Sequence, residues 1–234
     1  MMRTLLETPS QTAGPYVHIG LVPERAGLHR AREVCGPNLL AGISAEAATS
    51  GGFVKAQPII VEGRVIDASS SAVLDAVVEL WQADHQGSFA DASGAGFRGW
   101  GRSAVHPVDA MYRFFTIKPG AVSALGGRLM APHLALWIVA RGINLGLHTR
   151  MYFPEDADHH REDPVLRTVE LAVRRATLVG RLVTAQQVQS ESAPVYAVQS
   201  PTDLGGPGTA FAHAPRYRFD IVLQGPDETV FFDV

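Results

Sequence analysis

The stretch from Pro132 to Phe153 constrains the fold of this chain more than any other part of the sequence. Its pattern indicates two strands around a turn that contains glycine, and the first strand, residues 134–140, is apolar at nearly every position. A short apolar run with β-branched residues is typical of a strand that is covered on both faces, as in the middle of a sandwich. We therefore predict a hairpin whose first strand is central and has His133 at its entrance.

Short β-type runs separated by turn residues continue from Pro58 onward, with few helical interruptions. We expect strands within residues 58–66, 76–83, 111–117, 177–183, 217–223 and 229–232. Between them, we expect a long functional loop over 84–106 and an excursion from the core over 186–215. Short strands without long helices predict an all-β fold, a mixed but mostly antiparallel β-sandwich.

Residues 154–171 are acidic and contain the adjacent pair His159 and His160. We interpret this pair as solvated side chains on a flexible loop, because sequence neighbours rarely point at one metal. A short helix is predicted over 164–169, with Asp163 as its cap and proline at its first position.

Residues 1–57 show no sustained strand or helix period, and we expect an extended N-terminal arm ahead of a β-sandwich domain over 58–234. Two interpretations of the arm stay open. It is either a frayed terminus or a segment that orders against the core or a partner, since its prolines reduce the entropy lost on ordering.

The composition excludes several functional classes. The net charge of −3 is spread over the chain, so it offers no case for a nucleic acid or an anionic membrane as a partner. One cysteine, Cys35, leaves no internal disulfide, and no base lies near it in sequence, so we assign it no role. The start has no apolar run typical of a signal peptide, and we expect a cytoplasmic protein.

The common catalytic motifs are absent from the sequence. It has no Gly-x-Ser-x-Gly elbow, no phosphate-binding loop, no dinucleotide fingerprint and no His-Glu-x-x-His helix. His133 lies at the most interesting position, but one imidazole cannot hold a metal. The residue types alone therefore predict a β-sandwich domain and no particular chemistry.

Several motifs, in the same order along the chain, resemble those of the alpha subunits of protocatechuate 3,4-dioxygenases, which belong to the intradiol ring-cleaving dioxygenase family. These motifs cover residues 7–21, 78–84, 116–120, 130–133, 140–144, 148–153 and 229–233. The resemblance spans nearly the whole chain. Residues 38–57, the segment near Gly94 and residues 186–215 have no clear counterpart.

The resemblance implies a ring-cleaving reaction and indicates which subunit holds the metal. The family cleaves catechol rings between the two hydroxylated carbons with a non-haem ferric iron held by two tyrosines and two histidines, and hard phenolate oxygens favour the ferric state. The four ligand positions fall at Phe89, Val122, His133 and Ala135, so three of the four donors are missing. We therefore expect no metal on this chain and Fe(III) in a partner beta subunit.

The resemblance also implies a substrate-binding role for this chain. Thr12, Gly14 and Pro15 would line the substrate pocket of the beta subunit, and Arg141 would contact the substrate. These residue types suit an aromatic acid. Gly14 and Pro15 let the backbone approach the ring closely, Thr12 offers a hydroxyl, and the Arg141 cation can face the carboxylate. The expected reaction is intradiol cleavage of protocatechuate by O2 to 3-carboxy-cis,cis-muconate, in aromatic-compound catabolism, by a higher oligomer of alpha–beta pairs.

Two alternatives remain at this point. The first is a stand-alone intradiol dioxygenase with a remodelled metal site built from His133, His148 and either Tyr112 or Tyr152. The second is a catalytically silent β-sandwich that serves only as a scaffold or binding module.

Overall fold

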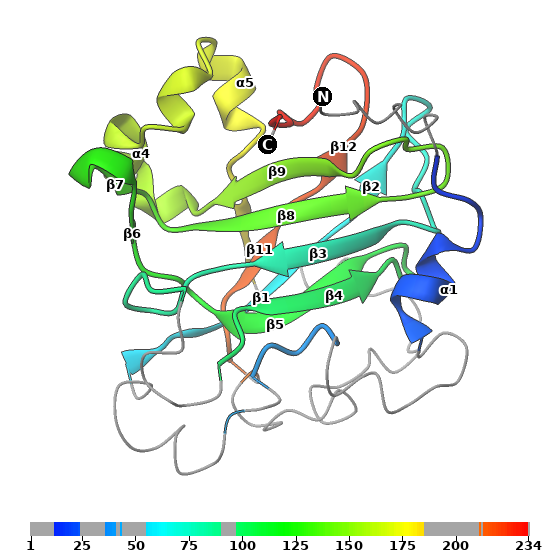
Figure 1. The fold of residues 1–234 in the computed structure, drawn as a ribbon, viewed down its shortest axis with the longest axis horizontal. Coiled ribbons are helices and arrows are strands. Elements are labelled where there is room, and N and C mark those ends of the chain that lie inside the picture. The colour runs from blue at the N-terminus through cyan, green and yellow to red at the C-terminus, as the bar shows by residue number, and fades with distance from the viewer. Residues whose placement is uncertain are drawn as a thin grey trace, which may run out of the picture.

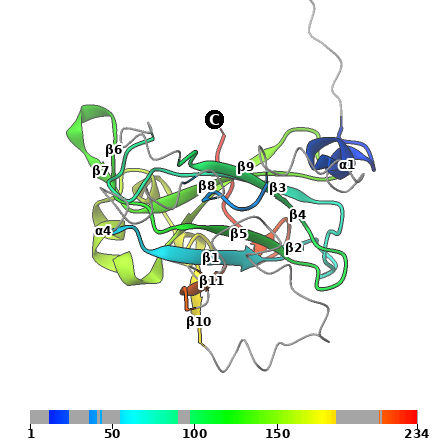
Figure 2. The same ribbon diagram turned by 90° about the horizontal axis from the view of Figure 1, so that it is seen from below.

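The computed structural model describes residues 12–23, 36–40, 43, 55–89, 97–184, 211 and 213–233. Within these residues the chain forms two four-stranded sheets that pack face to face, which confirms the predicted all-β sandwich (Figures 1 and 2). Cys35 and nearly all of the predicted 186–215 excursion lie outside the described residues. Among the described helices, none has the length and apolar character needed to cross a membrane.

The first sheet has the strand order β10-β11-β1-β5, and the second has the order β4-β3-β8-β9. The strands of the first sheet are β1 (Pro58–Gly63), β5 (Tyr112–Ile117), β10 (Arg181–Val183) and β11 (Arg216–Arg218). Those of the second sheet are β3 (Val77–Trp81), β4 (Trp100–Ala104), β8 (His133–Val139) and β9 (Leu147–Tyr152). Parallel pairing of β1 with β11 makes the first sheet mixed, whereas the second sheet is antiparallel throughout.

Shorter elements complete the described fold. Two small sheets pair β2 (Val65–Ile66) with β12 (Ile221–Val222) and β6 (Val122–Ser123) with β7 (Leu129–Met130). The α-helices are α1 (Val17–Leu21), α4 (Ala157–Glu162) and α5 (Ala172–Ala176). Single 3-10 turns occur at Leu125–Gly127, Pro154–Asp156 and Leu166–Thr168.

The core lies between the two large sheets, because alternate residues of each strand point inward. Leu134, Leu136 and Ile138 of β8 are buried there, and they belong to one cluster with Ile59 and Val61 of β1. Burial of each such side chain contributes about 1.5–3 kcal/mol relative to exposure. This apolar layer holds the second sheet in a fixed position, so its outward-facing residues have defined neighbours.

The predicted hairpin is confirmed, with β8 between β3 and β9. The expectation that both faces of β8 are covered is only partly right. Helix α1 lies over one end of the outer face, where Val22 packs with Val77 and Val139, but Ala135 and Trp137 remain partly exposed. An apolar run does not reveal how much of each face a neighbouring element covers.

Several other expectations need correction. Strand β4 lies inside the predicted 84–106 loop, and the predicted 217–223 strand is divided into β11 and β12. Of the predicted 177–183 strand, residues 181–183 form β10, whereas 177 and 178 form a turn and Val179 makes a single bridge to Tyr152. Within 229–232 a bridge pairs Phe232 with His148. The described part of the arm contains the helix α1, whereas an extended segment was predicted.

Candidate functional site

The arm and the β8–β9 turn meet at one edge of the second sheet. The backbone N–H of Ala13 donates to the carbonyl of Ile143 at 3.1 Å, and the N–H of Gly142 donates to the carbonyl of Ala13 at 3.2 Å. These two bonds join segments that are far apart in sequence. They place the predicted substrate-binding residues Thr12 and Gly14 beside the turn that carries Arg141.

The predicted residues at this edge are open to solvent. Thr12, Gly14 and Pro15 are exposed, and a Cβ atom added at Gly14 would meet no atom within 4 Å. The Arg141 side chain is 67% exposed and lies 3.4 Å from an Asp75 carboxylate oxygen, an ion pair that solvent screens. The structure thus brings together all four predicted substrate-binding residues, on a surface that could contact an anionic molecule.

Large apolar side chains are exposed next to these residues. Tyr16 is 75% exposed and Leu145 is 81% exposed, and both are sequence neighbours of residues at the edge. Gly142, which follows Arg141, has φ of 88°, a conformation that glycine adopts without strain. We call residues 12–16 together with the turn 141–145 the edge. It exposes the Thr12 hydroxyl, the Arg141 guanidinium and the apolar surface of Tyr16 and Leu145.

The four positions that the resemblance assigns to metal ligands lie on segments that strand pairing, chain order or a backbone hydrogen bond connects. His133 and Ala135 are two residues apart on β8 and therefore share its outer face. Val122 lies on β6, whose partner β7 is followed directly by β8. The turn that leads to Phe89 is held against the segment before β6, because the N–H of Gly120 donates to the Asp84 carbonyl at 2.8 Å.

The side chains at these positions do not fit a ferric site. Phe89, Val122 and Ala135 have no donor atom, and Phe89 is exposed whereas Val122 is buried. His133 is buried, and its Nδ1 donates to the Ala131 carbonyl at 2.8 Å. Burial, and after it the positive charge of Arg150, lowers the pKa of His133 to about 4, so the ring is neutral. A lone imidazole without phenolate partners is a poor match for Fe(III).

The remodelled metal site that we considered is not assembled either. His148 pairs with Trp137 on β8, four residues beyond His133 and therefore about 13 Å along the strand. Tyr112 lies in the other sheet, where its hydroxyl donates to the Phe219 carbonyl. Only Tyr152 lies next to His133, at 5.6 Å between ring centroids.

The tyrosine hydroxyls are also unsuited to metal binding. Burial raises the pKa of Tyr112, and burial together with the Asp163 carboxylate raises that of Tyr152, so both remain protonated. Among the described residues, no group of three or more His, Cys, Asp or Glu side chains could hold a metal ion. No metal-dependent step can therefore be derived from the described side chains.

Asp163 supports the entrance to β8. Its carboxylate accepts the N–H of Ala131 at 2.8 Å and those of Val165 and Leu166 at 2.8 and 2.9 Å. Its predicted capping role is confirmed, although the turn that follows is a single 3-10 turn and not the longer helix expected. The predicted flexible loop is also wrong, since His159 and His160 lie on α4, and the His160 ring contacts Tyr152 edge-on at 5.6 Å.

A pocket of about 730 Å³ lies on the outer face of the second sheet, and sequence reasoning missed it. Ala135 and Arg150, which pair across β8 and β9, both line it. The alternation of His148, Arg150 and Tyr152 along β9 was the available signal, because period-2 polar residues indicate an outward face. This alternation does not show which residue of β8 faces Arg150. Only the register of the hairpin places Arg150 opposite Ala135, one of the positions that the resemblance assigns to metal ligands.

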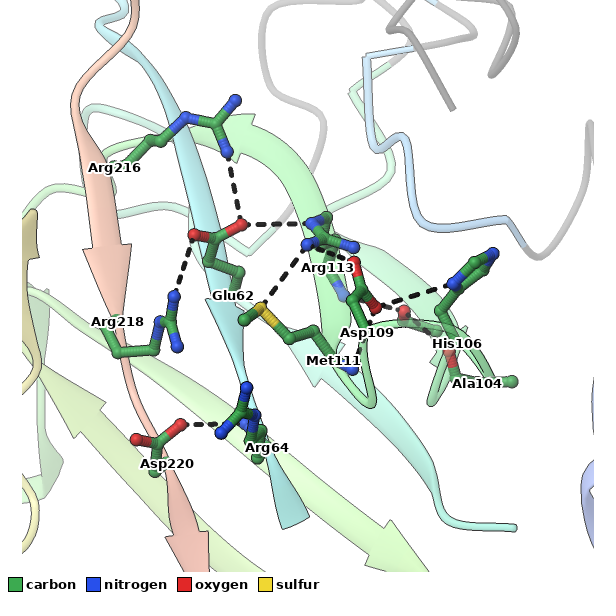
Figure 3. Close-up of polar contacts among 11 residues, drawn as sticks. Glu62, Arg64, Ala104, His106, Asp109, Met111, Arg113, Arg216, Arg218 and Asp220 are labelled. Atoms are coloured by element: carbon green, nitrogen blue, oxygen red, sulfur yellow. Dashed lines mark hydrogen bonds and ion pairs between the residues drawn. The ribbon is translucent and has the colours of Figure 1, made fainter. Parts of the chain in front are cut away.

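The outer face of the first sheet carries a cluster of ion pairs around Glu62 (Figure 3). Register places Glu62 of β1 between Arg113 of β5 and Arg218 of β11. Its carboxylate lies 3.0 Å from Arg113, 3.2 Å from Arg216 and 3.5 Å from Arg218, and Arg113 also pairs with Asp109 at 2.7 Å. Each of these arginines has a carboxylate partner, which is the pattern of a structural cluster that ties three strands together.

Comparison with known proteins agrees with this geometry. A family model described as "Dioxygenase" matches residues 44–225. The protocatechuate 3,4-dioxygenase alpha chain of Pseudomonas putida is 38% identical over 232 residues, which cover 98% of this chain and 97% of that one. The alpha chain of Burkholderia cepacia is 35% identical over 239 residues, covering 100% of both chains. The beta chain of Burkholderia cepacia is 31% identical over 181 residues, 73% of this chain and 66% of that one.

Solved structures share the fold at lower identity. Catechol 1,2-dioxygenase from Acinetobacter sp. ADP1 is 18% identical with a TM-score of 0.50, covering 74% of this chain and 54% of that one. The enzyme from Acinetobacter radioresistens is 17% identical with a TM-score of 0.50, covering 82% and 59%. These likenesses confirm the β-sandwich architecture.

Proposed function

Since this chain belongs to the intradiol ring-cleaving dioxygenase family, we propose that it is the alpha subunit of a protocatechuate 3,4-dioxygenase and acts beside a beta subunit that holds Fe(III). One observation carries the proposal: a chain similar to alpha chains over its full length has no donor atom at three of four ligand positions. Its sequence similarity to a beta chain supports a pair of related subunits.

The reaction that we propose for the complex is the cleavage of protocatechuate by dioxygen to 3-carboxy-cis,cis-muconate. Both atoms of dioxygen enter the product, so no reductant is required. The beta subunit would hold the iron, a cofactor of the family in general, which would make the catechol ring reactive towards dioxygen. This chain would contribute groups that bind and orient the carboxylated ring.

The edge formed by the arm and the β8–β9 turn suits that contribution. Its backbone bonds at Ala13 hold Thr12 and Gly14 in place before a substrate arrives, which lowers the entropy lost on binding. The open space around Gly14 lets an aromatic ring approach the backbone. The exposed Arg141 guanidinium can exchange its solvent-screened contact with Asp75 for a carboxylate in a dry cleft between subunits.

Co-expression with the cognate beta chain tests the proposal. We expect a stable complex that consumes protocatechuate and oxygen in equal amounts. Failure of the two chains to associate would contradict the subunit assignment. A complex that is fully active without any contribution from residues 12–15 or Arg141 would leave this chain with a scaffold role only.

The Arg141→Ala variant of the complex should raise the KM for protocatechuate by about tenfold or more, because a charge-assisted contact is lost. Cleavage of catechol, which has no carboxylate, should change much less. Arg161→Ala is the matched control, since Arg161 is an exposed arginine on α4 that pairs only with exposed Asp158 among the described residues. Equal KM values for wild type and Arg141→Ala would contradict the substrate-binding role.

A further inference from the structure

The pocket on the outer face of the second sheet has the size of a ligand site. Its volume of about 730 Å³ falls within the range of small-molecule pockets. The sheet forms its floor, and the segments that contain Val165 and Phe232 lie beside it. The residues that matter for its chemistry are Trp81, Ala135, Trp137, Arg150, Val165 and Phe232.

Aromatic side chains make up much of this surface. The three tryptophans of the chain, Trp81, Trp100 and Trp137, all lie on the outer face of this sheet, and Trp81 and Trp137 line the pocket. Trp81 packs against Trp100 at 5.8 Å between ring centroids but is still 52% exposed. The Trp137 indole lies directly over Gly146, where a Cβ atom would come within 1.6 Å of its Nε1. Two fixed indoles thus offer flat apolar contact area to a ligand.

Charge on this surface is not balanced at Arg150. Glu79, the buried acid of the same face, is neutralised by Arg102 and also accepts from the Trp100 indole at 3.4 Å. Within the described part of the chain, the Arg150 side chain contacts the Met130 sulfur at 3.4 Å and the Tyr152 hydroxyl and has no carboxylate partner. Asp233 also lines the pocket. Among the ion pairs of the described residues, none joins Asp233 to Arg150.

We propose that this pocket binds a small aromatic carboxylate, with its carboxylate on the Arg150 guanidinium and its ring against Trp81 and Trp137. A guanidinium binds a carboxylate through two parallel hydrogen bonds, and a partly buried cation gains most from such an anion. Apolar walls disfavour a strongly hydrated ion such as phosphate. Arg150 lies opposite Ala135, one of the positions that the resemblance assigns to metal ligands, so the site favours an anion where that resemblance implies a metal cation. This ligand site goes beyond the proposed subunit function.

Intrinsic fluorescence of the purified full chain tests this site, because every tryptophan lies on this face. Titration with sodium benzoate should give a saturable change, and benzamide, a neutral ligand of similar shape, should bind at least about tenfold more weakly. Arg150→Gln should weaken benzoate binding at least about tenfold and remove the preference over benzamide. Arg161→Gln, an exposed arginine away from the pocket lining, should bind benzoate like the wild type.

A second variant guards against effects of Arg150 on folding. Ala135→Leu keeps the guanidinium but fills the pocket beside it, so it should also abolish saturable binding. The proposal is overturned by equal affinity for benzoate and benzamide, by benzoate binding that Arg150→Gln leaves unchanged, or by the absence of saturation in the folded wild type. None of these results depends on a beta subunit, so they are separate from the test of the proposed function.

Discussion

The two outer faces of the sandwich each place a buried glutamate on an inner strand, but they surround it differently. Glu62 on β1 lies among arginines that all have carboxylate partners (Figure 3). Glu79 on β3 takes one arginine, Arg102, while Arg150 two strands away has no carboxylate partner in the described part of the chain. On the first face every arginine of the cluster has a carboxylate partner within the chain, whereas the second face keeps a cation beside an open pocket.

This difference separates a structural role from a ligand-binding one. Charges that are taken out of water must be paired, and removal of one partner costs more than the pair contributes. The Glu62 face satisfies this condition with its own side chains. On the face around Arg150, the cation is paired only when an anion enters the pocket. Loss of Arg150 should therefore destabilise the fold far less than loss of Glu62 does on the other face.

The largest effect should come from Glu62→Gln. This change leaves Arg113, Arg216 and Arg218 close together without the shared carboxylate and should destabilise the chain by about 3–5 kcal/mol. Arg150→Gln should cost less than about 1 kcal/mol, since it breaks no ion pair seen in the described residues. Urea unfolding of both variants at neutral pH measures the difference. Similar losses in the two variants would mean that the faces do not differ as argued.

An intermediate effect is expected for Glu79→Gln. The carboxylate is buried, but the Arg102 side chain is 24% exposed and also packs over the Trp100 ring at 5.0 Å, so it can turn toward water. The loss should be about 1–2 kcal/mol, which is below that of Glu62→Gln. The same unfolding assay ranks the two variants. A larger loss for Glu79→Gln would place the more costly charge cluster on the pocket face.

The smallest effect concerns acid sensitivity at the edge of the Glu62 cluster. Burial alone would raise the pKa of Asp109, but its hydrogen bond and charge interaction with Arg113 outweigh this and lower that pKa below 3.8. Stability from this group is therefore present above the unfolded-state pKa of about 3.9 and is lost as the pH falls below it. Asp109→Asn should approach wild-type stability as the pH is lowered from about 5 to about 3. A gap that stays constant over this range would exclude the ionised carboxylate as the cause.

Local sequence patterns were sufficient to predict the sandwich and its central hairpin. Residues 134–140 are too apolar for an exposed strand, and the short β-type runs around them leave little room for helices. Strand β4 was not predicted, because Trp100-Gly-Arg-Ser-Ala104 has little intrinsic strand preference. It forms a strand because it pairs with β3. Helix α4 was not predicted, because a helix of six residues depends on tertiary contacts more than on its own sequence.

The candidate sites depended on information that local patterns do not contain. The bonds between Ala13 and the turn at 142–143 join residues about 130 positions apart, so only the resemblance assigned Thr12 and Arg141 to the same substrate site. The position of Arg150 opposite Ala135 follows from the register of the hairpin, and a one-residue slip would have put it on the other face. Long-range register therefore determined what sequence reasoning missed.

The iron content of the purified chain and of its complex with the beta subunit tests the central claim most directly. The account predicts one iron per alpha–beta pair, and neither iron nor a visible tyrosinate-to-iron absorption band in this chain alone, because Phe89, Val122 and Ala135 offer no donor. Stoichiometric iron with that absorption band in the chain by itself would contradict it.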